Sequence, residues 1–272
     1  MEAGLHRRFF ELEDWYWWSV GTRAIFHEWL APLLRVRGAR VLDVGCGSGA
    51  FAAELRDAAS VTGVDLALEA IRLGRRRGLR DLSVGSAEAL PFRDAAFDGV
   101  AALDIVEHTD DVRTLAEIAR VVRPGGVVLV HVPAFPFLWG EHDEVNHHRR
   151  RYRRGELLAR LTASGLRVRR ISYVNCVLFP AVAAARVGKR LLRRLQAPRP
   201  PRPEVYDLPS WLNRTLAGCL ALERLALRRL DMPIGVSLLC LADKPPREAL
   251  RKSLDVVEMA CVGATGWGGW DG

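Results

Sequence analysis

Short apolar runs rich in valine, leucine and alanine recur along the first half of the chain, and segments of helical periodicity separate them. The runs predict strands at residues 40–44, 61–64, 82–84, 97–103 and 127–132. The segments between them, and one before the first run, place apolar residues three or four positions apart. They predict helices at residues 23–34, 51–56, 68–77 and 112–122.

Strands that alternate with helices at this spacing indicate right-handed strand–helix–strand units and a parallel sheet. The strand runs are apolar at successive positions, so we expect helices to cover both faces of that sheet. The chain has 272 residues, of which 49% are hydrophobic, which is typical of a folded globular protein with one sizeable core. The predicted fold class is therefore α/β.

The pattern changes after Pro133. Residues 134–154 are rich in aromatic residues, histidine and arginine and show no periodicity. Further along, the spacing predicts a helix at 155–164, a strand at 166–173, a helix at 211–230 and a strand at 236–242. A long insertion lies between these last two strands. It contains an apolar segment at 174–187, a basic stretch at 189–194 and a Pro/Arg linker at 198–203.

Charge and cysteine content limit the class of protein only loosely. The net charge of +8 suits nucleic acid, an anionic membrane face or an acidic substrate. The five cysteines show neither metal nor redox spacing, which favours a reducing, cytoplasmic setting. No secretory signal is evident, and no uncharged apolar run reaches the roughly 20 residues that a membrane-spanning helix needs.

The segment Val41–Gly49 predicts a strand that runs into a glycine loop and then a helix. Ligands of open α/β sheets bind at this edge, and glycines let the backbone approach them closely. The loop reads G-x-G-x-G rather than the G-x-G-x-x-G of dinucleotide sites, and Asp43 precedes it. A carboxylate there suits a ligand with ammonium and sulfonium groups better than a pyrophosphate. Asp65 ends the next strand, where a carboxylate accepts hydrogen bonds from ribose hydroxyls.

This loop resembles motif I of the class I methyltransferases that use S-adenosylmethionine (SAM). Four later segments resemble further motifs of that family in the same order. They are Gly85–Phe92 its D-A-E-x-L-P-F loop, with Ser86 in place of the Asp, Phe97–Val100 the strand that follows, Leu103–His108 its E-H ending, and Arg123–Gly126 its turn before strand five. The resemblance covers residues 38–133. It implies a Rossmann-like sheet of seven strands with the last strand, here 236–242, antiparallel. It implies SAM as cofactor, held by Asp43, Gly45, Cys46, Gly47, Gly49, Asp65, Leu66, Ser86, Ala87, Glu88 and Asp104.

The segment Glu13–Arg23 resembles an N-terminal E-x-x-H-W-W-F-x-x-R segment of a bacterial methyltransferase subgroup, with Tyr16 replacing the His and Ser19 the Phe. In that subgroup the segment helps to close the cofactor cleft. The resemblance implies that Trp17, Trp18 and Arg23 cover the cofactor, since a sulfonium over an aromatic face gains cation–π energy. Tryptophans that only pack on the sheet edge are the alternative.

Methyl transfer needs alignment of the acceptor and, for a hydroxyl or ammonium acceptor, removal of a proton. Histidine titrates near neutral pH, so His148, His142 and His108 are the candidate bases, each with the alternative of a surface or loop histidine. The group His142, Asp143, His147 and His148 also suggests a metal site. Because Arg149–Arg151 flank it and would repel a cation, no metal is expected.

Residues 174–195 are apolar and then basic, which suits peripheral contact with an anionic membrane or a cap over a lipid-linked substrate. An ordinary helix packed on the core is the alternative. Arg149–Arg154 suit a phosphate, but no RNA-binding module accompanies them, so nucleic acid is not an expected partner. The oligomeric state is open. The Trp/Gly-rich end at 263–272 reads as a flexible tail.

The function expected from the resemblance is transfer of a methyl group from SAM to O or N of a small-molecule, lipid-linked or sugar-linked acceptor. An NAD-type oxidoreductase and a non-catalytic protein that binds a membrane or partner remain as alternatives. The expected division of the chain is N-terminal cap helices at 1–37, a SAM-binding core at 38–174, a helical insertion at 175–232, the last strand at 233–244 and a flexible tail at 245–272.

Overall fold

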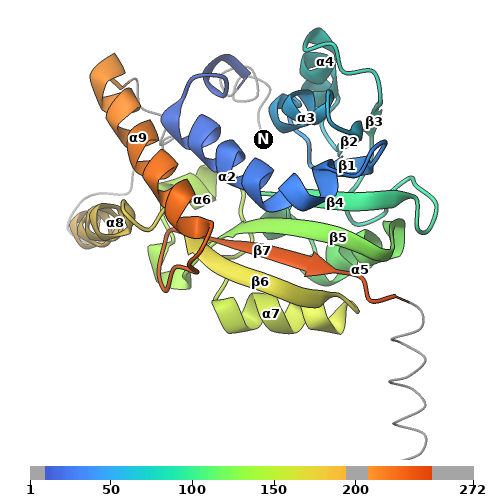
Figure 1. Cartoon of the computed structure of the whole chain (residues 1–272). Helices are drawn as coiled ribbons and strands as arrows, with labels where there is room; N and C mark the ends of the chain where they lie inside the picture. The colour runs from blue at the N-terminus through green and yellow to red at the C-terminus, as the bar shows by residue number, and fades with distance from the viewer. Residues whose placement is uncertain (1–9, 194–207, 247–272) are drawn as a thin grey trace, which may run out of the picture.

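The computed structural model describes residues 10–193 and 208–246 (Figure 1). Within them, seven strands form one sheet in the order β3-β2-β1-β4-β5-β7-β6. Strand β7 is antiparallel to both β5 and β6, and the other pairs are parallel. The strands are β1 (Arg40–Val44), β2 (Ser60–Asp65), β3 (Leu82–Val84), β4 (Phe97–Leu103), β5 (Val122–Pro133), β6 (Arg167–Val174) and β7 (Ser237–Asp243). The predicted α/β class and antiparallel last strand are confirmed.

Helices cover both faces of the sheet, as the apolar strands predict. On one face α2, α3 and α9 pack over a cluster that includes Phe26, Leu55 and Leu227, and on the other α5 and α7 pack around Leu115 and Leu161 (Figure 1). The helices are α2 (Trp17–Leu34), α3 (Ala50–Leu55), α4 (Leu68–Arg76), α5 (Asp111–Val121), α6 (Glu141–Val145), α7 (Arg154–Ala163), α8 (Phe179–Arg193) and α9 (Ser210–Leu227), with 3-10 turns η1 (Val106–His108) and η2 (Pro136–Leu138).

Helix α2 begins at Trp17, six residues before the predicted start. Its first N–H group, that of Trp17, donates to Asn213 Oδ1 at 2.9 Å, and Asn213 lies on α9. A free N–H at a helix start normally needs a local capping side chain, so a cap from a distant helix leaves no local signal in the sequence.

Two other predictions differ from the structure. The turn predicted at 124–126 is an irregular stretch inside β5, because Val122 already pairs with Phe97 and the register then shifts before Gly99. The non-periodic segment 134–154 contains η2 and α6, which are shorter than the window over which periodicity can be read.

Some expectations fall outside the described residues, namely the Pro/Arg linker 198–203 and the Trp/Gly-rich end 263–272. The four described cysteines, Cys46, Cys176, Cys219 and Cys240, are free thiols. No helix in the described part of the chain combines the length and apolarity needed to cross a membrane.

Helices α2 and α9 run side by side (Figure 1), and a glycine sets their separation. A Cβ on Gly21 would lie 2.8 Å from Leu220 Cβ, whereas a Cβ on Gly218 would meet nothing within 4 Å. We expect Gly21→Ala to cost about 1–3 kcal/mol of unfolding free energy through overpacking. Gly218→Ala, on the exposed side of the same pair, should stabilise by about 0.5–1 kcal/mol. Calorimetry measures the change of unfolding free energy in each variant. Equal changes in the two variants would contradict the close approach of α2 and α9 at Gly21.

Candidate cofactor and acceptor site

The glycine loop between β1 and α3 makes a tight turn. Gly45, Gly47 and Gly49 have φ of +71°, +53° and +77°, a region that favours glycine. A Cβ on Gly45 would lie 2.6 Å from Ile105, and one on Gly49 would clash with the Leu79 side chain. A Cβ on Gly47 would meet nothing within 4 Å. The outer two glycines therefore serve packing, while the middle one faces open space.

Asp65 ends β2 beside this loop. Its Oδ2 accepts a hydrogen bond from Gly47 N at 2.9 Å, and its Oδ1 accepts one from Ala67 N at 2.8 Å. A carboxylate has about four acceptor positions, so two remain for hydroxyl groups of a ligand. Asp65 thus holds the loop and keeps capacity to bind a ribose.

Acidic side chains gather behind the loop. Asp43 is 3% exposed, and its Oδ2 has no hydrogen-bond partner. Burial, together with the charges of Asp65 and Glu13, raises the pKa of Asp43 to about 7. Burial also raises the pKa of Glu13 to about 7, although Arg77 opposes it. Buried carboxylates in this state favour a cationic ligand and disfavour an anionic one. The neighbouring Cys46 is buried, and burial raises the pKa of its thiol, so it is not a nucleophile.

The N-terminal segment lies against the same loop. Glu13 accepts hydrogen bonds from the Ser48 hydroxyl and, at 2.6 Å, from Arg77, which also bonds Asp14 at 2.8 Å. These contacts hold the segment across the loop and the end of α4. Sequence reasoning missed Glu13 as part of the site, although the residue stands in the quoted motif.

The residues that the N-terminal resemblance assigns to the cofactor are partly engaged elsewhere. Arg23 Nε donates to Glu54 Oε1 of α3 at 2.7 Å, and its side chain is 10% exposed. Trp18 is half-buried and packs edge-on against Trp17, with ring centroids 5.6 Å apart. Their assignment to the cofactor stays a prediction.

An apolar surface follows β2 and β3. Leu66 is 75% exposed and Val84 is 50% exposed, which is unusual for large apolar residues beside a sheet edge. Ala87 is buried next to it, and Ser86 Oγ accepts from Glu88 N at 3.1 Å. Leu66 and Ser86 suit the face and edge of an adenine.

Glu88 has a structural task in this conformation. Its Oε1 accepts the Asp110 N–H at 2.8 Å, just before α5 begins. The side chain therefore joins the loop of Ser86 to α5, and its predicted contact with the cofactor is not needed to explain the residue.

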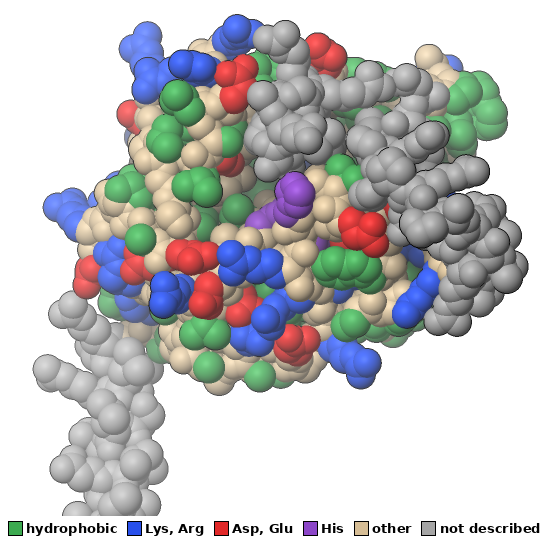
Figure 2. Space-filling model, turned by 180° about the vertical axis from the view of Figure 1, so that it is seen from behind, with side chains coloured by type: hydrophobic (Ala, Val, Ile, Leu, Met, Phe, Trp, Pro, Cys, Tyr) green, Lys and Arg blue, Asp and Glu red, His purple; other side chains and the backbone are tan. Residues whose placement is uncertain are grey.

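The three candidate bases come together. His108 ends η1, His142 lies in α6 and His148 follows α6; the His148 ring centroid lies 4.6 Å from that of His108 and 5.7 Å from that of His142. Histidine side chains reach the surface on the face seen in Figure 2. Sequence reasoning named all three without placing them in one cluster.

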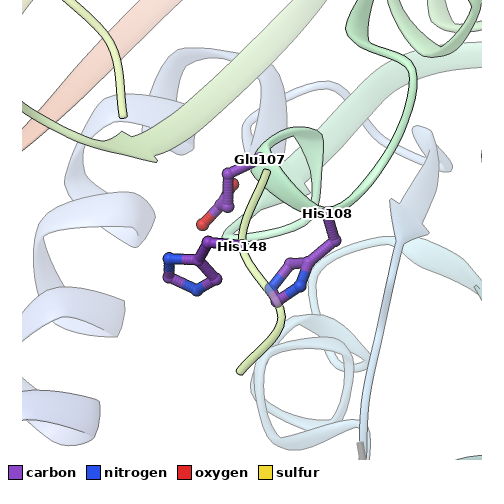
Figure 3. Close-up of side chains that lie close together, drawn as sticks. All are labelled: Glu107, His108 and His148. Carbon is purple, nitrogen blue, oxygen red and sulfur yellow. The ribbon is translucent and has the colours of Figure 1, made fainter. Parts of the chain in front are cut away.

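Glu107 belongs to this cluster, and sequence reasoning gave it no role. Figure 3 shows it beside His108 and His148. It is 1% exposed, and neither carboxylate oxygen has a hydrogen-bond partner. Burial, with the charge of Asp104, raises the pKa of Glu107 well above 4.5. Burial and His148 lower the pKa of His108 to about 4, so its ring is neutral at pH 7.

Asp104 has φ of +54° and lies between β4 and the cluster. Its Oδ1 is 2.8 Å from Nδ1 of the fully buried His131. The Asp104 side chain is half exposed, and the charges of His131, His148 and His108 lower its pKa. An ionised carboxylate there suits the ammonium end of an amino-acid moiety.

Asp143 fixes the loop that carries His148. It is fully buried and accepts hydrogen bonds at 2.8 Å from His148 Nδ1, Arg151 Nε and Gly140 N. Burial acts to raise its pKa, but these bonds hold it well below 3.8. The group of His142, Asp143, His147 and His148 that the sequence suggested as a metal site does not form one set of ligands. Asp143 bonds Arg151, and His147 is exposed.

Comparisons with known proteins find a methyltransferase domain in this part of the chain. Residues 42–130 match the family model of a methyltransferase domain. The chain is 40% identical over 117 residues to the O-methyltransferase rstn1 of Aspergillus nomiae, covering 39% of this chain and 52% of that protein. It is 36% identical over 132 residues to the ubiquinone biosynthesis O-methyltransferase of Paracidovorax citrulli, covering 41% and 54%.

The chain spans about half the length of the curated relatives it matches. Among solved structures, the complex of the Haloferax volcanii Trm112 methyltransferase activator with a putative methyltransferase matches with a TM-score of 0.58 and 22% identity, covering 89% of this chain and 95% of that one. This similarity to a solved structure concerns the fold alone.

Proposed function

We propose that this chain, of which residues 42–130 match the family model of a methyltransferase domain, transfers the methyl group of SAM to an oxygen atom of a small-molecule acceptor. The observation that carries the proposal is that the glycine loop and the histidine cluster share one edge of the sheet. Strands β1 and β4 are parallel neighbours, and Gly45 contacts Ile105, three residues before His108.

The acidic surroundings of the loop support SAM against a dinucleotide. SAM brings a sulfonium and an ammonium group, which gain energy beside Asp43, Glu13 and Asp65. A pyrophosphate would meet three carboxylates, two of them buried enough that burial raises the pKa to about 7. The NAD-type alternative therefore requires a like-charge contact that SAM avoids.

The histidine cluster supports an acceptor that must lose a proton. In the transfer, the acceptor oxygen forms a bond to the methyl carbon while the carbon–sulfur bond breaks, giving S-adenosylhomocysteine and a methyl ether. The hydroxyl proton passes to an imidazole of the cluster of His108, His142 and His148. The two curated relatives are named O-methyltransferases, which favours oxygen over nitrogen.

Helix α8 borders the acceptor side, since its Arg186 bonds Leu138 O and lies 3.2 Å from Asp143. Val177 and Val187 are exposed on and just before it. A greasy or lipid-linked acceptor that lies along this helix fits the described surface at 174–190, and peripheral membrane contact through 174–195 is part of the proposal. A pull-down with anionic lipid vesicles tests it, and equal recovery without vesicles would contradict the contact.

Isothermal titration calorimetry tests the cofactor assignment. We expect S-adenosylhomocysteine to bind one-to-one and NAD to give no saturable heat, because of the acidic loop. Formation of S-adenosylhomocysteine from SAM in the presence of a panel of hydroxylated aromatic compounds then tests the transfer. Binding of NAD alone would reject the proposal.

A further inference from the structure

We propose that Glu107, His108 and His148 bind a divalent first-row transition metal ion at the acceptor side of the sheet edge. One carboxylate oxygen and one ring nitrogen from each histidine lie within 4.8 Å of one another (Figure 3). Donors bound at about 2.0–2.2 Å to one zinc ion lie roughly 3–4 Å apart, so side-chain adjustments of about an ångström bring all three onto one ion.

The state of Glu107 points independently to a cation. A buried carboxylate normally has hydrogen-bond donors or an ion pair, because its charge is costly away from water. Glu107 is 1% exposed with both oxygens unpartnered, and its side chain is directed at the two imidazoles (Figure 3). A divalent ion between these groups supplies the missing partner.

The surroundings of His148 are those of a metal ligand. Its Nδ1 bonds Asp143 at 2.8 Å, which leaves Nε2 as the nitrogen available to an ion. A metal-bound histidine usually has such a carboxylate on its other nitrogen, where it fixes the ring orientation. Asp143 also accepts from Arg151, whose guanidinium is bonded further to Ala134 O at 3.1 Å. Each of the three arginines expected to repel a cation has an acidic partner: Arg151 pairs with Asp143, Arg150 lies 3.2 Å from Asp111, and Arg149 lies 3.9 Å from Glu88.

Two histidines and one glutamate form a donor set that zinc enzymes use with an open coordination position. At that position the ion would bind a hydroxyl oxygen of the acceptor and lower its pKa, and the proton would pass to an imidazole outside the ligand set. His142 alone among the three candidate bases stays outside the ligand set. This role of the ion rests on the proposed function, whereas binding of the ion does not.

The test uses the full chain, free of any affinity tag and stripped with a chelator, titrated calorimetrically with Zn²⁺ and, for its visible spectrum, with Co²⁺. We expect one ion per chain. Glu107→Gln and His148→Ala should each weaken binding by at least about 100-fold, and Asp143→Asn by about 10- to 100-fold. His147→Ala, which changes the exposed neighbour, is the matched control and should bind as the wild type does.

Binding of S-adenosylhomocysteine, measured on the same samples, separates this inference from the proposed function. Retained binding in Glu107→Gln shows that the variant is folded. Absence of saturable metal binding in the wild type, or equal affinity in Glu107→Gln, His148→Ala and the control, would overturn the metal site and leave the cofactor assignment standing. Metal binding without S-adenosylhomocysteine binding would reject the cofactor assignment and leave the metal site standing.

Discussion

Replacing Asp65 with alanine is expected to weaken S-adenosylhomocysteine binding by about 10²- to 10⁴-fold. Two ribose hydroxyls would each lose a hydrogen bond to a charged acceptor, worth about 1.5–3 kcal/mol. The loop would also lose its anchor, because the Asp65 carboxylate accepts from Gly47 N and Ala67 N. Titration calorimetry measures the affinity, and thermal unfolding checks that the variant is folded.

Asp57→Ala is the matched control, since its carboxylate is 94% exposed in the turn between α3 and β2. Gly47→Val offers a second variant, which places a side chain in the open space beside the loop at φ +53°. Gly38→Val carries a comparable strain at φ +73° away from the site and separates strain from lost binding. If Asp65→Ala bound as tightly as Asp57→Ala, the ribose assignment would be wrong.

Replacing Asp43 with asparagine is expected to change stability and binding in opposite directions. Burial raises the pKa of Asp43 from 3.8 to about 7, so the charged form destabilises the ligand-free fold. A shift of that size corresponds to at most about 4 kcal/mol. Asp43→Asn removes this cost and should raise Tm at pH 8 by several degrees. It should also weaken S-adenosylhomocysteine binding, because the ligand's ammonium group loses a buried counter-charge.

The pH dependence of the unfolding free energy tests the sign of this effect. A carboxyl whose pKa is higher in the folded state loses stability as pH rises above its unfolded-state pKa, because the unfolded chain then releases the proton more readily than the folded chain does. The unfolding free energy of the wild type should therefore fall relative to Asp43→Asn as pH rises from about 4 to 7, and the two should converge near pH 4. Thermal unfolding across this range, with Asp57→Asn as the control, measures it. A difference that stays constant with pH would refute the burial of a charged Asp43.

The sheet was predictable because each strand contains a local run of mostly apolar residues. The strands at 40–44, 82–84 and 97–103 were predicted with the bounds that the structure has, and the others within one residue, except at the start of β5. The start of β5 was missed because it depends on pairing of Val122 with Phe97, which a local pattern cannot contain. The start of α2 was missed for the same kind of reason, since Asn213 of α9 provides its cap.

The sequence allowed us to predict which residues belong to the candidate site, but not which other residues each of them contacts. The spacing of Gly45, Gly47 and Gly49 with Asp65 was visible in the sequence. All four residues lie within one strand–loop–helix unit and the strand that follows it, a stretch of fewer than 25 residues. Arg23 shows the limit: the sequence offered it to the cofactor, and the fold pairs it with Glu54.

The sequence by itself determined the class of fold, the glycine loop and the identity of the three histidines. Only the tertiary structure decided that Glu107, His108 and His148 meet, because η1 follows β4 while His148 stands 40 positions later beyond α6. It also decided that Asp143 serves His148 and Arg151. The physical reason is that hydrophobic periodicity records which face of an element is buried, whereas the meeting of polar side chains depends on how whole elements are placed.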